Sequence, residues 1–369
     1  MIPLTDLRRQ HEELAESIEA GVLKVLRSQR LILGEYVERF EDEVRTFLGA
    51  EDAVGVSSGS DGLVLSLLDA GIGPGDEVIT TPLTFVATAE AICRVGATPV
   101  FADVEPEQLS LTKETIERAL SERTRAVIIV HLFGHVGPLQ EVADYCRALG
   151  LVLIEDAAQA FGARVGARAV GTFGDYGVFS FFPAKVLGGA GDAGLVVSAA
   201  ERGGRLRQLR VHGHVGGGEF AQVSGNYRLD AIQAAVLSAK LPHVPRFLSE
   251  RRAHAGAYEQ GLAQLKSSLE LPRERSGTTS AWNYYVVRAS NAPELIFGLK
   301  ERGIATTGYY WTPLHRQRCF AGRARATSLD ISEQVAPKLV ALPLFPELTP
   351  EEREAVIRGV SGLVEETSA

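Results

Sequence analysis

Cysteine is scarce in this chain, with three in 369 residues, and the three lie far apart. Cys93, Cys146 and Cys319 form no CxxC pair, so the sequence offers neither a zinc site nor a disulfide framework. No apolar run approaches the roughly 20 residues that a membrane helix requires, and charges interrupt the first positions where a secretory signal would be apolar. These absences predict a cytoplasmic protein with no membrane partner.

An excess of positive charge is missing as well. There are 38 Lys and Arg against 46 Asp and Glu, a net charge of −8. This balance argues against nucleic acid as the main partner, although it leaves room for a local basic patch that binds a phosphorylated substrate. A hydrophobic content of 45% in a chain of this length favours one large domain with a smaller one beside it.

Short apolar runs alternate with helical patterns through the first half of the chain. This alternation predicts an α/β fold, with a large domain built on a mostly parallel seven-stranded sheet between helices. The expected strands are residues 53–57, 77–81, 98–104, 125–131, 151–155, 176–182 and 194–198.

Helical spacing of apolar residues continues on both sides of this region. We expect a boundary near Val244, which divides a large domain (1–243) from a smaller C-terminal α+β domain (244–369). Residues 202–225 predict a helix and then a long loop, in which His212 and His214 lack the neighbours of a metal site. The expected helices are residues 10–33, 37–48, 138–149, 226–240, 246–265, 294–302 and 350–364, and a strand is expected at 282–290.

One lysine stands in unusual surroundings. Lys185 follows an apolar run and precedes a glycine-rich turn in GDYGVFSFFPAKVLGGAGDAG, residues 174–194. A buried amine shifts its pKa readily and can form a Schiff base with a carbonyl compound. The same position also suits a lysine that ends a strand at the surface.

Two further stretches offer groups for a ligand. In LVLIEDAAQAFGA, residues 151–163, an apolar run ends at Glu155 and Asp156, with Gln159 close behind. Acidic groups at the carboxyl end of a parallel strand lie where open α/β sheets bind ligands, although Asp156 could also cap a helix. In VSSGSDGLVL, residues 56–65, small residues before a helix predict an anion site without the spacing of a nucleotide-binding loop.

Taken in order, these motifs resemble the DegT/StrS type of sugar aminotransferases, which are fold-type-I enzymes that use pyridoxal 5′-phosphate (PLP). The resemblance covers nearly the whole chain. The motifs that carry it are PLTDLRRQ, SSGSDGL, TPLTFVATAEAI, GATPVFADV, EDAAQAFGA, SFFPAKVLGGAGD, GNYRLDAIQAA and TPLH.

The resemblance implies a role for individual residues. PLP would be bound covalently to Lys185 at rest, with Asp156 at the pyridine nitrogen and Gln159 beside the ring oxygen. The other residues that it implies are Gly59, Ser60 and Ser180 at the phosphate, Phe85 stacked on the ring, and Asn226 reaching the phosphate of the neighbouring subunit in a homodimer. Candidates for binding the substrate are Arg228 and His315. Tyr309 and Tyr310 are further candidates.

The implied reaction moves an amino group from L-glutamate to a nucleotide-linked keto sugar by ping-pong kinetics. SFFPAKVLG is nearer to the motif of members that act at C-3 of a dTDP- or UDP-linked sugar than to that of C-4 enzymes. Alternatives are a C-4 keto sugar or a cyclitol as substrate, and a non-enzymatic PLP-binding regulator. A dehydratase is disfavoured, because those relatives have histidine at the position of Lys185. Val186 and Ala193 depart from the family pattern near the expected path of the substrate.

Overall fold

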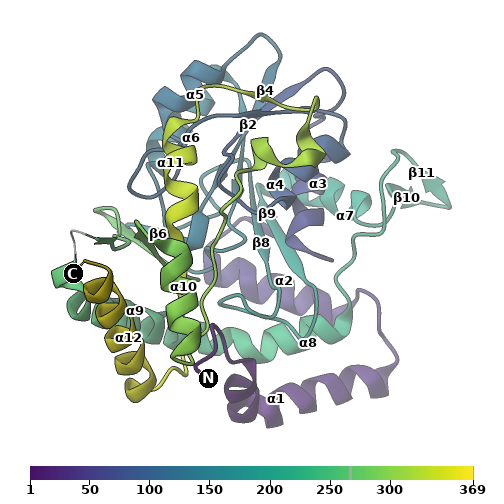
Figure 1. Ribbon diagram of the computed structural model, residues 1–369. Coiled ribbons are helices and arrows are strands. Elements are labelled where there is room, and N and C mark those ends of the chain that lie inside the picture. The colour runs from purple at the N-terminus through teal and green to yellow at the C-terminus, as the bar shows by residue number, and fades with distance from the viewer. Residues whose placement is uncertain (266–267, 369) are drawn as a thin grey trace.

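The computed structural model describes residues 1–265 and 268–368, and a single large sheet forms its centre (Figure 1). The sheet has eight strands, with every neighbour parallel except for the two pairs that β9 makes. In spatial order the strands are β1 (Asp52–Val56), β9 (Gly194–Ser198), β8 (Tyr176–Ser180), β5 (Val152–Asp156), β4 (Thr124–Val130), β2 (Glu77–Thr80), β3 (Thr98–Phe101) and β15 (Arg325–Ala326).

All seven expected strands are present, but the count of seven was wrong. The missing strand, β15, consists of two exposed residues from late in the chain that pair in parallel with β3. No hydrophobic run marks so short a segment, so periodicity could not reveal it.

Alternate residues of each strand point to opposite sides of the sheet, so both faces carry apolar side chains. Helices cover both of these faces. Val78 and Val178 belong to the hydrophobic cluster that includes α3, α4 and α7, whereas Ile79 and Phe179 belong to the cluster on the other face. The helices of this part of the chain are α1 (Leu7–Ser28), α2 (Glu35–Leu48), α3 (Gly59–Asp69), α4 (Ala87–Arg94), α5 (Lys113–Ala119), α6 (Leu139–Leu149), α7 (Ala200–Leu209) and α8 (Ala231–Lys240).

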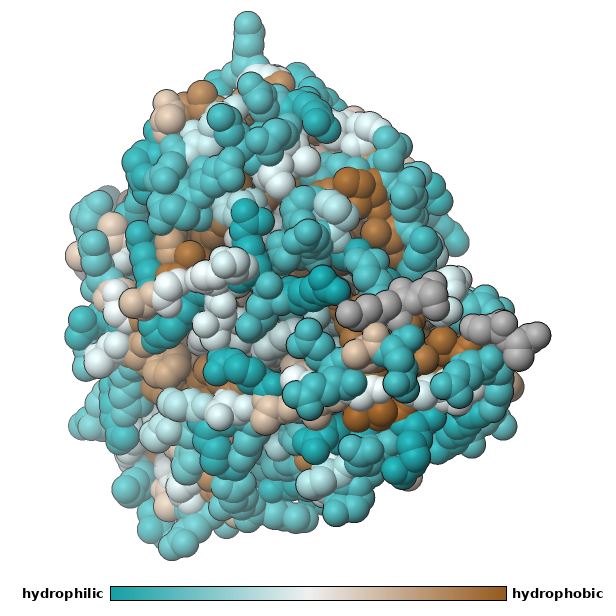
Figure 2. All heavy atoms as spheres, turned by 90° about the vertical axis from the view of Figure 1, so that its left-hand side faces the viewer, coloured by the Kyte–Doolittle hydropathy of each residue, from teal (hydrophilic) through white to brown (hydrophobic). Residues whose placement is uncertain are grey.

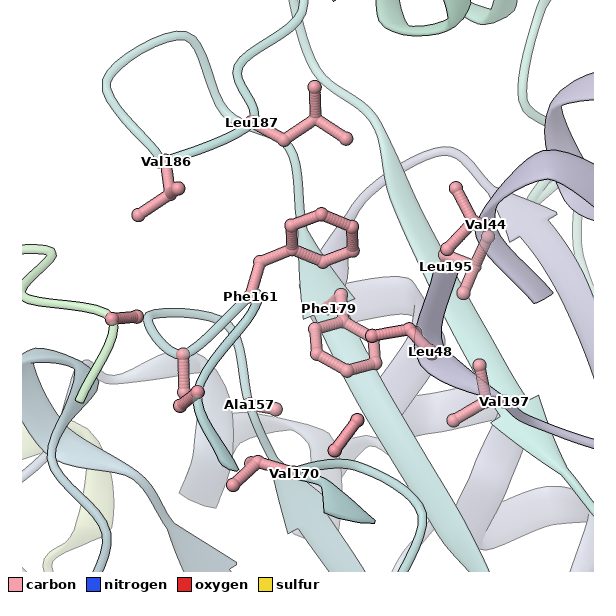
Figure 3. Packing of buried hydrophobic residues seen from close by; sticks show 14 of the residues in the cluster. Val44, Leu48, Ala157, Phe161, Val170, Phe179, Val186, Leu187, Leu195 and Val197 are labelled. Atoms are coloured by element: carbon pink, nitrogen blue, oxygen red, sulfur yellow. The ribbon is translucent and has the colours of Figure 1, made fainter. Parts of the chain in front are cut away.

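Figure 3 shows the part of this core that supports the ends of β5 and β8. The rings of Phe161 and Phe179 pack edge to face, with centroids 5.4 Å apart. Val186 joins the same cluster, and Ala193 is buried in it as well. Both residues that depart from the family pattern are therefore packed in the core.

Two expectations for residues 202–240 were wrong. The helix expected from residue 226 begins only at Ala231, where Asp230 caps it by accepting a hydrogen bond from the backbone N–H of Gln233. Residues 226–230 instead run in extended bridges beside Val211, Val56 and Ile32. The expected loop contains a hairpin of β10 (His214–Gly216) and β11 (Glu219–Phe220), which projects from the body (Figure 1).

The C-terminal part forms a second core around a small antiparallel sheet. Its strands are β12 (Leu269–Glu270), β14 (Tyr285–Ala289) and β16 (Leu339–Leu342), and its helices are α9 (Val244–Gly261), α10 (Ala292–Glu301), α11 (Asp330–Val335) and α12 (Pro350–Ser368). A further small sheet consists of β6 (Arg164–Val165), β7 (Arg168–Ala169) and β13 (Thr278–Thr279).

Helix α9 links the two cores, since Phe247 packs in the first and Tyr258 in the second. The domain boundary near Val244 stays a prediction. Hydrophilic residues dominate the face shown in Figure 2, where hydrophobic residues lie in separate patches. Among the described residues, no helix is both long and apolar enough to cross a membrane.

Candidate functional site

The expected site residues gather at one edge of the large sheet. Because β1, β5 and β8 run parallel to one another, their carboxyl ends share this edge. Asp156 ends β5, Ser180 ends β8, and the turn into α3 follows β1. Residues that are far apart in the sequence are therefore neighbours here.

Asp156 is a buried carboxylate whose described hydrogen-bond partners are neutral groups. Its Oδ2 accepts a hydrogen bond from Oγ1 of Thr88 at 2.7 Å, and its Oδ1 accepts one from the backbone N–H of Ala158 at 3.2 Å. Burial raises the pKa of Asp156, against the opposing effects of these two bonds and of the nearby Lys185 and His131 side chains. A cation placed against this carboxylate would bring the pKa back down.

Glu155, the neighbouring acid, has a structural task. It points to the other side of the strand, where its oxygens accept hydrogen bonds from the backbone N–H groups of Gly171, Phe173 and Gly174 at 2.6–2.8 Å. Nε2 of His131 lies 3.2 Å from Oε2 of the same carboxylate. Of the two acids in the motif, only Asp156 is therefore free to serve a ligand.

Lys185 lies in the segment that follows β8. Its backbone N–H donates to the carbonyl of Phe182 at 2.8 Å, which forms a tight turn after the strand. Burial lowers the pKa of the Lys185 amine to about 8, although the carboxylate of Asp156 acts in the opposite direction. Roughly a tenth of the amine is then unprotonated at pH 7, which is the form that attacks a carbonyl carbon.

The amide of Gln159 is held in one orientation by two partners. Its Oε1 accepts a hydrogen bond from the backbone N–H of Phe133 at 2.7 Å, and its Nε2 donates to the hydroxyl of Tyr310 at 3.2 Å. The ring of Phe85 is 54% exposed and lies 6.3 Å from that of Tyr310. An exposed aromatic ring beside this amide offers a flat surface for a second ring.

The turn between β1 and α3 packs closely against the end of β8 and the start of β9. Ser58 caps α3 by accepting a hydrogen bond from the backbone N–H of Asp61 at 3.1 Å. A Cβ on Gly194 would lie 2.6 Å from the backbone nitrogen of Gly59. A Cβ on Gly59 would lie 2.9 Å from the Cβ atom of Ser180. This turn brings Gly59, Ser60 and Ser180 together at a helix N-terminus, where an anion is stabilised.

The remaining expected residues lie around this edge in different settings. Arg228 pairs with Val56 at the end of β1, and the side chain of Asn226 is exposed. Tyr309 packs its ring 4.9 Å from that of Tyr284. Nε2 of His315 lies 2.9 Å from Oε1 of Glu333, so this histidine is engaged within the chain itself.

The sequence analysis did not predict a role for Thr84 or Thr88. Their spacing of four residues within the motif TPLTFVATAEAI was the available signal. A cavity of about 1110 Å³ lies at the opposite edge of the sheet, beside Arg147, Arg168 and Asp175. In the described part of the chain, no group of three or more His, Cys, Asp and Glu residues could hold a metal ion.

Two curated relatives cover almost the whole chain. A protein of Geobacillus stearothermophilus named "Pleiotropic regulatory protein" is 40% identical over 98% of each chain. A protein of Acidithiobacillus ferrooxidans named as a UDP-N-acetyl-3-dehydro-alpha-D-glucosamine 3-aminotransferase is 41% identical over 95% of each chain.

Two solved structures share the fold. DesV of S. venezuelae, in complex with a ketimine intermediate, has a TM-score of 0.95 at 38% identity and covers 99% of this chain and 98% of that one. NtdA of Bacillus subtilis, with bound cofactor PMP, has a TM-score of 0.92 at 26% identity and covers 99% of this chain and 85% of that one. The model of the DegT/DnrJ/EryC1/StrS aminotransferase family matches residues 12–361, and the chain belongs to this family.

Proposed function

We propose that this protein is a PLP-dependent aminotransferase that moves an amino group from L-glutamate to C-3 of a dTDP- or UDP-linked keto sugar. The observation that carries the proposal is the meeting of Lys185, Asp156 and Gln159 at the carboxyl edge of the sheet, beside the N-terminus of α3. The curated relative from A. ferrooxidans is named for a 3-aminotransferase reaction, which supports the choice of carbon.

The residues of this edge fit PLP. The carboxylate of Asp156 is buried with neutral hydrogen-bond donors, so a protonated pyridine nitrogen would supply the charge that it lacks. The turn at Gly59 and the hydroxyl of Ser180 suit a phosphate, and the exposed ring of Phe85 suits stacking. The amine of Lys185 would be the point of covalent attachment.

When bound, PLP supplies an electron sink for negative charge at the carbon next to the transferred nitrogen. The carboxylate of Asp156 would sustain that sink, because a negative charge beside the pyridine nitrogen favours its protonated form. Nζ of Lys185 would act as the general base that takes the proton from Cα of the amino donor. Its lowered pKa, about 8, suits a group that must lose and regain a proton near neutral pH. The amide of Gln159 would hold the ring oxygen of the cofactor.

Three residues near the edge are our candidates for the sugar nucleotide. Arg228, beside the end of β1, offers a guanidinium for the diphosphate. Tyr309 belongs to an aromatic segment that packs against the sheet. His315 already pairs with Glu333, so it would act on the substrate only together with that carboxylate.

A regulatory role is the alternative of a different class, and the printed name of the relative from G. stearothermophilus gives it weight. A C-4 keto sugar or a cyclitol is the alternative within the same class. The presence of Lys185, Asp156 and Gln159 together favours catalysis, because a protein that only binds PLP has no need of a poised base. The three free cysteines accord with the cytoplasmic location that we propose.

We also propose a homodimer with shared active sites. The side chain of Asn226 is exposed, and the nearby hairpin β10–β11 projects from the body with Phe220 61% exposed (Figure 1). On α1, Leu23 and Leu26 are 46% and 41% exposed. Exposed apolar side chains of this kind suit a surface that a second copy covers.

Mixing two inactive variants tests the sharing of sites. In heterodimers of Lys185→Ala and Asn226→Ala, one site would carry both changes and the other neither. Refolding the two together should therefore restore roughly a quarter of the wild-type activity, since half of the dimers are mixed and each has one intact site. Activity no higher than the sum of the two variants alone would argue against shared sites.

The absorption spectrum of the purified protein tests the reaction itself. We expect the band of lysine-bound PLP in the wild type, its loss on addition of L-glutamate, and stoichiometric release of 2-oxoglutarate. Lys185→Ala should bind PLP without that band and release no 2-oxoglutarate. If the wild type binds PLP but leaves glutamate unchanged, the regulatory alternative takes its place.

A further inference from the structure

Two buried threonines lie directly behind Asp156. Thr84 lies between β2 and α4 and Thr88 lies in the first turn of α4, and their exposed fractions are 3% and 1%. Oγ1 of Thr88 lies 2.7 Å from Oδ2 of Asp156, and Oγ1 of Thr84 lies 2.9 Å from Oγ1 of Thr88. The three side chains thus form a buried chain of hydrogen bonds that ends on the carboxylate.

The donors along this chain can be assigned by counting hydrogens. An ionised carboxylate accepts hydrogen bonds only, and a threonine hydroxyl has a single hydrogen to donate. Thr88 must therefore give its hydrogen to Asp156, and the hydrogen between the two threonines must come from Thr84. Each hydroxyl is then committed to one direction, and the whole chain favours the ionised carboxylate.

We propose that Thr88, oriented in turn by Thr84, is a positioning residue that holds the carboxylate of Asp156 in one orientation toward the PLP ring nitrogen. The inference rests on the proposed function, because it concerns the group that Asp156 serves. Without Thr88, the described partner left to the carboxylate is the longer bond from the backbone N–H of Ala158, at 3.2 Å. The carboxylate would then be free to rotate about its side chain.

The same segment also carries the aromatic ring of the site. Phe85 lies between the two threonines, and its ring is 54% exposed while both hydroxyls are buried. The backbone N–H of Thr88 donates to the carbonyl of Phe85 at 3.3 Å, so the aromatic residue and the donor are joined in one turn. TFVAT thus places a ring toward the ligand and a hydroxyl behind the ligand's acidic partner.

The test compares Thr88→Val, which keeps the shape but loses the hydroxyl, with Thr88→Ser, which keeps the hydroxyl. We expect Thr88→Val to bind PLP about tenfold more weakly, because it loses a hydrogen bond to a charged group. Thr88→Ser should stay near the wild type. Thr80→Val is the matched control, since the hydroxyl of Thr80 is equally buried but donates to the carbonyl of Ile128.

A second readout separates positioning from a general loss of structure. With ¹⁵N-labelled PLP, the chemical shift of the ring nitrogen reports its protonation directly. We expect a protonated nitrogen in the wild type, Thr88→Ser and Thr80→Val, and a partly unprotonated one in Thr88→Val. Should Thr88→Val fail to fold, Thr84→Val provides the comparison, because it removes only the donor to Thr88 and should give a smaller change in the same direction.

Failure of this inference differs from failure of the proposed function. If the wild type forms the lysine-bound band with PLP but Thr88→Val matches it in affinity and in the ¹⁵N shift, the positioning role is wrong and the aminotransferase proposal stands. If the wild type itself shows no such band, both are wrong.

Discussion

Gln159 and Tyr310 are 151 positions apart in the chain, yet Nε2 of Gln159 donates to the hydroxyl of Tyr310 at 3.2 Å. The bond joins the residue that follows β5 to a segment that lies beyond the predicted domain boundary. Because Gln159 donates in this bond, the hydrogen of the Tyr310 hydroxyl is left for another acceptor. Burial raises the pKa of Tyr310, so the hydroxyl stays protonated and serves as a donor.

Replacing Tyr310 with phenylalanine should lower kcat/KM about fivefold, the equivalent of one hydrogen bond of about 1 kcal/mol. The amide of Gln159 would lose its partner, and the free donor would disappear from the site. Steady-state kinetics with glutamate and with the keto sugar would measure the change. Tyr145→Phe is the control, since that ring packs over Nζ of Lys113 on helix α5, away from this edge. Equal kinetics for both variants would remove Tyr310 from the site.

Replacing the carboxylate with an amide should have different effects at the two adjacent acids of β5. Glu155→Gln places an NH₂ group where the carboxylate accepts three backbone N–H groups, so at least one buried donor would face another donor. We expect a loss of about 1–3 kcal/mol in the free energy of unfolding, measured by urea denaturation. Asp156→Asn should unfold near the wild-type midpoint, because the Thr88 hydroxyl can rotate to accept a hydrogen bond from the new amide. The same variant should lose activity, because it lacks the carboxylate. A stable Glu155→Gln protein would contradict the structural role of Glu155.

How far the sequence could predict this site depends on the range of each contact. Lys185, Asp156 and Gln159 could be predicted because each lies at or shortly after the end of an apolar strand, and parallel strand ends share one edge. The bond of Thr88 to Asp156 spans 68 positions, and no local pattern announces it. The start of α8 was missed for a related reason: Leu229 lies at helical spacing from the apolar residues of α8, but bridges to Val56 and Val211 hold residues 226–230 extended.

A buried amine makes the stability of the protein depend on pH. Lys240, at the end of α8, is 7% exposed, and its Nζ donates to the carbonyl of Gly188 in the turn after Lys185 at 2.7 Å. Burial lowers its pKa from 10.5 to about 8, although the charge of Glu347 acts in the opposite direction. Between these two values the unfolded chain binds more protons than the folded one.

The free energy of unfolding should therefore rise as the pH increases from about 8 to 10.5, by at most about 1.4 kcal/mol per pH unit from Lys240 alone. Below pH 8 both states hold the proton, so this slope vanishes. Lys240→Met should flatten the rise, which urea unfolding of the cofactor-free protein at several pH values would measure. Lys300→Met, at an exposed position on α10, controls for the loss of one charge. If the free energy of unfolding has the same pH dependence in both methionine variants, the amine of Lys240 has the same pKa in the folded and unfolded states, and the prediction is wrong.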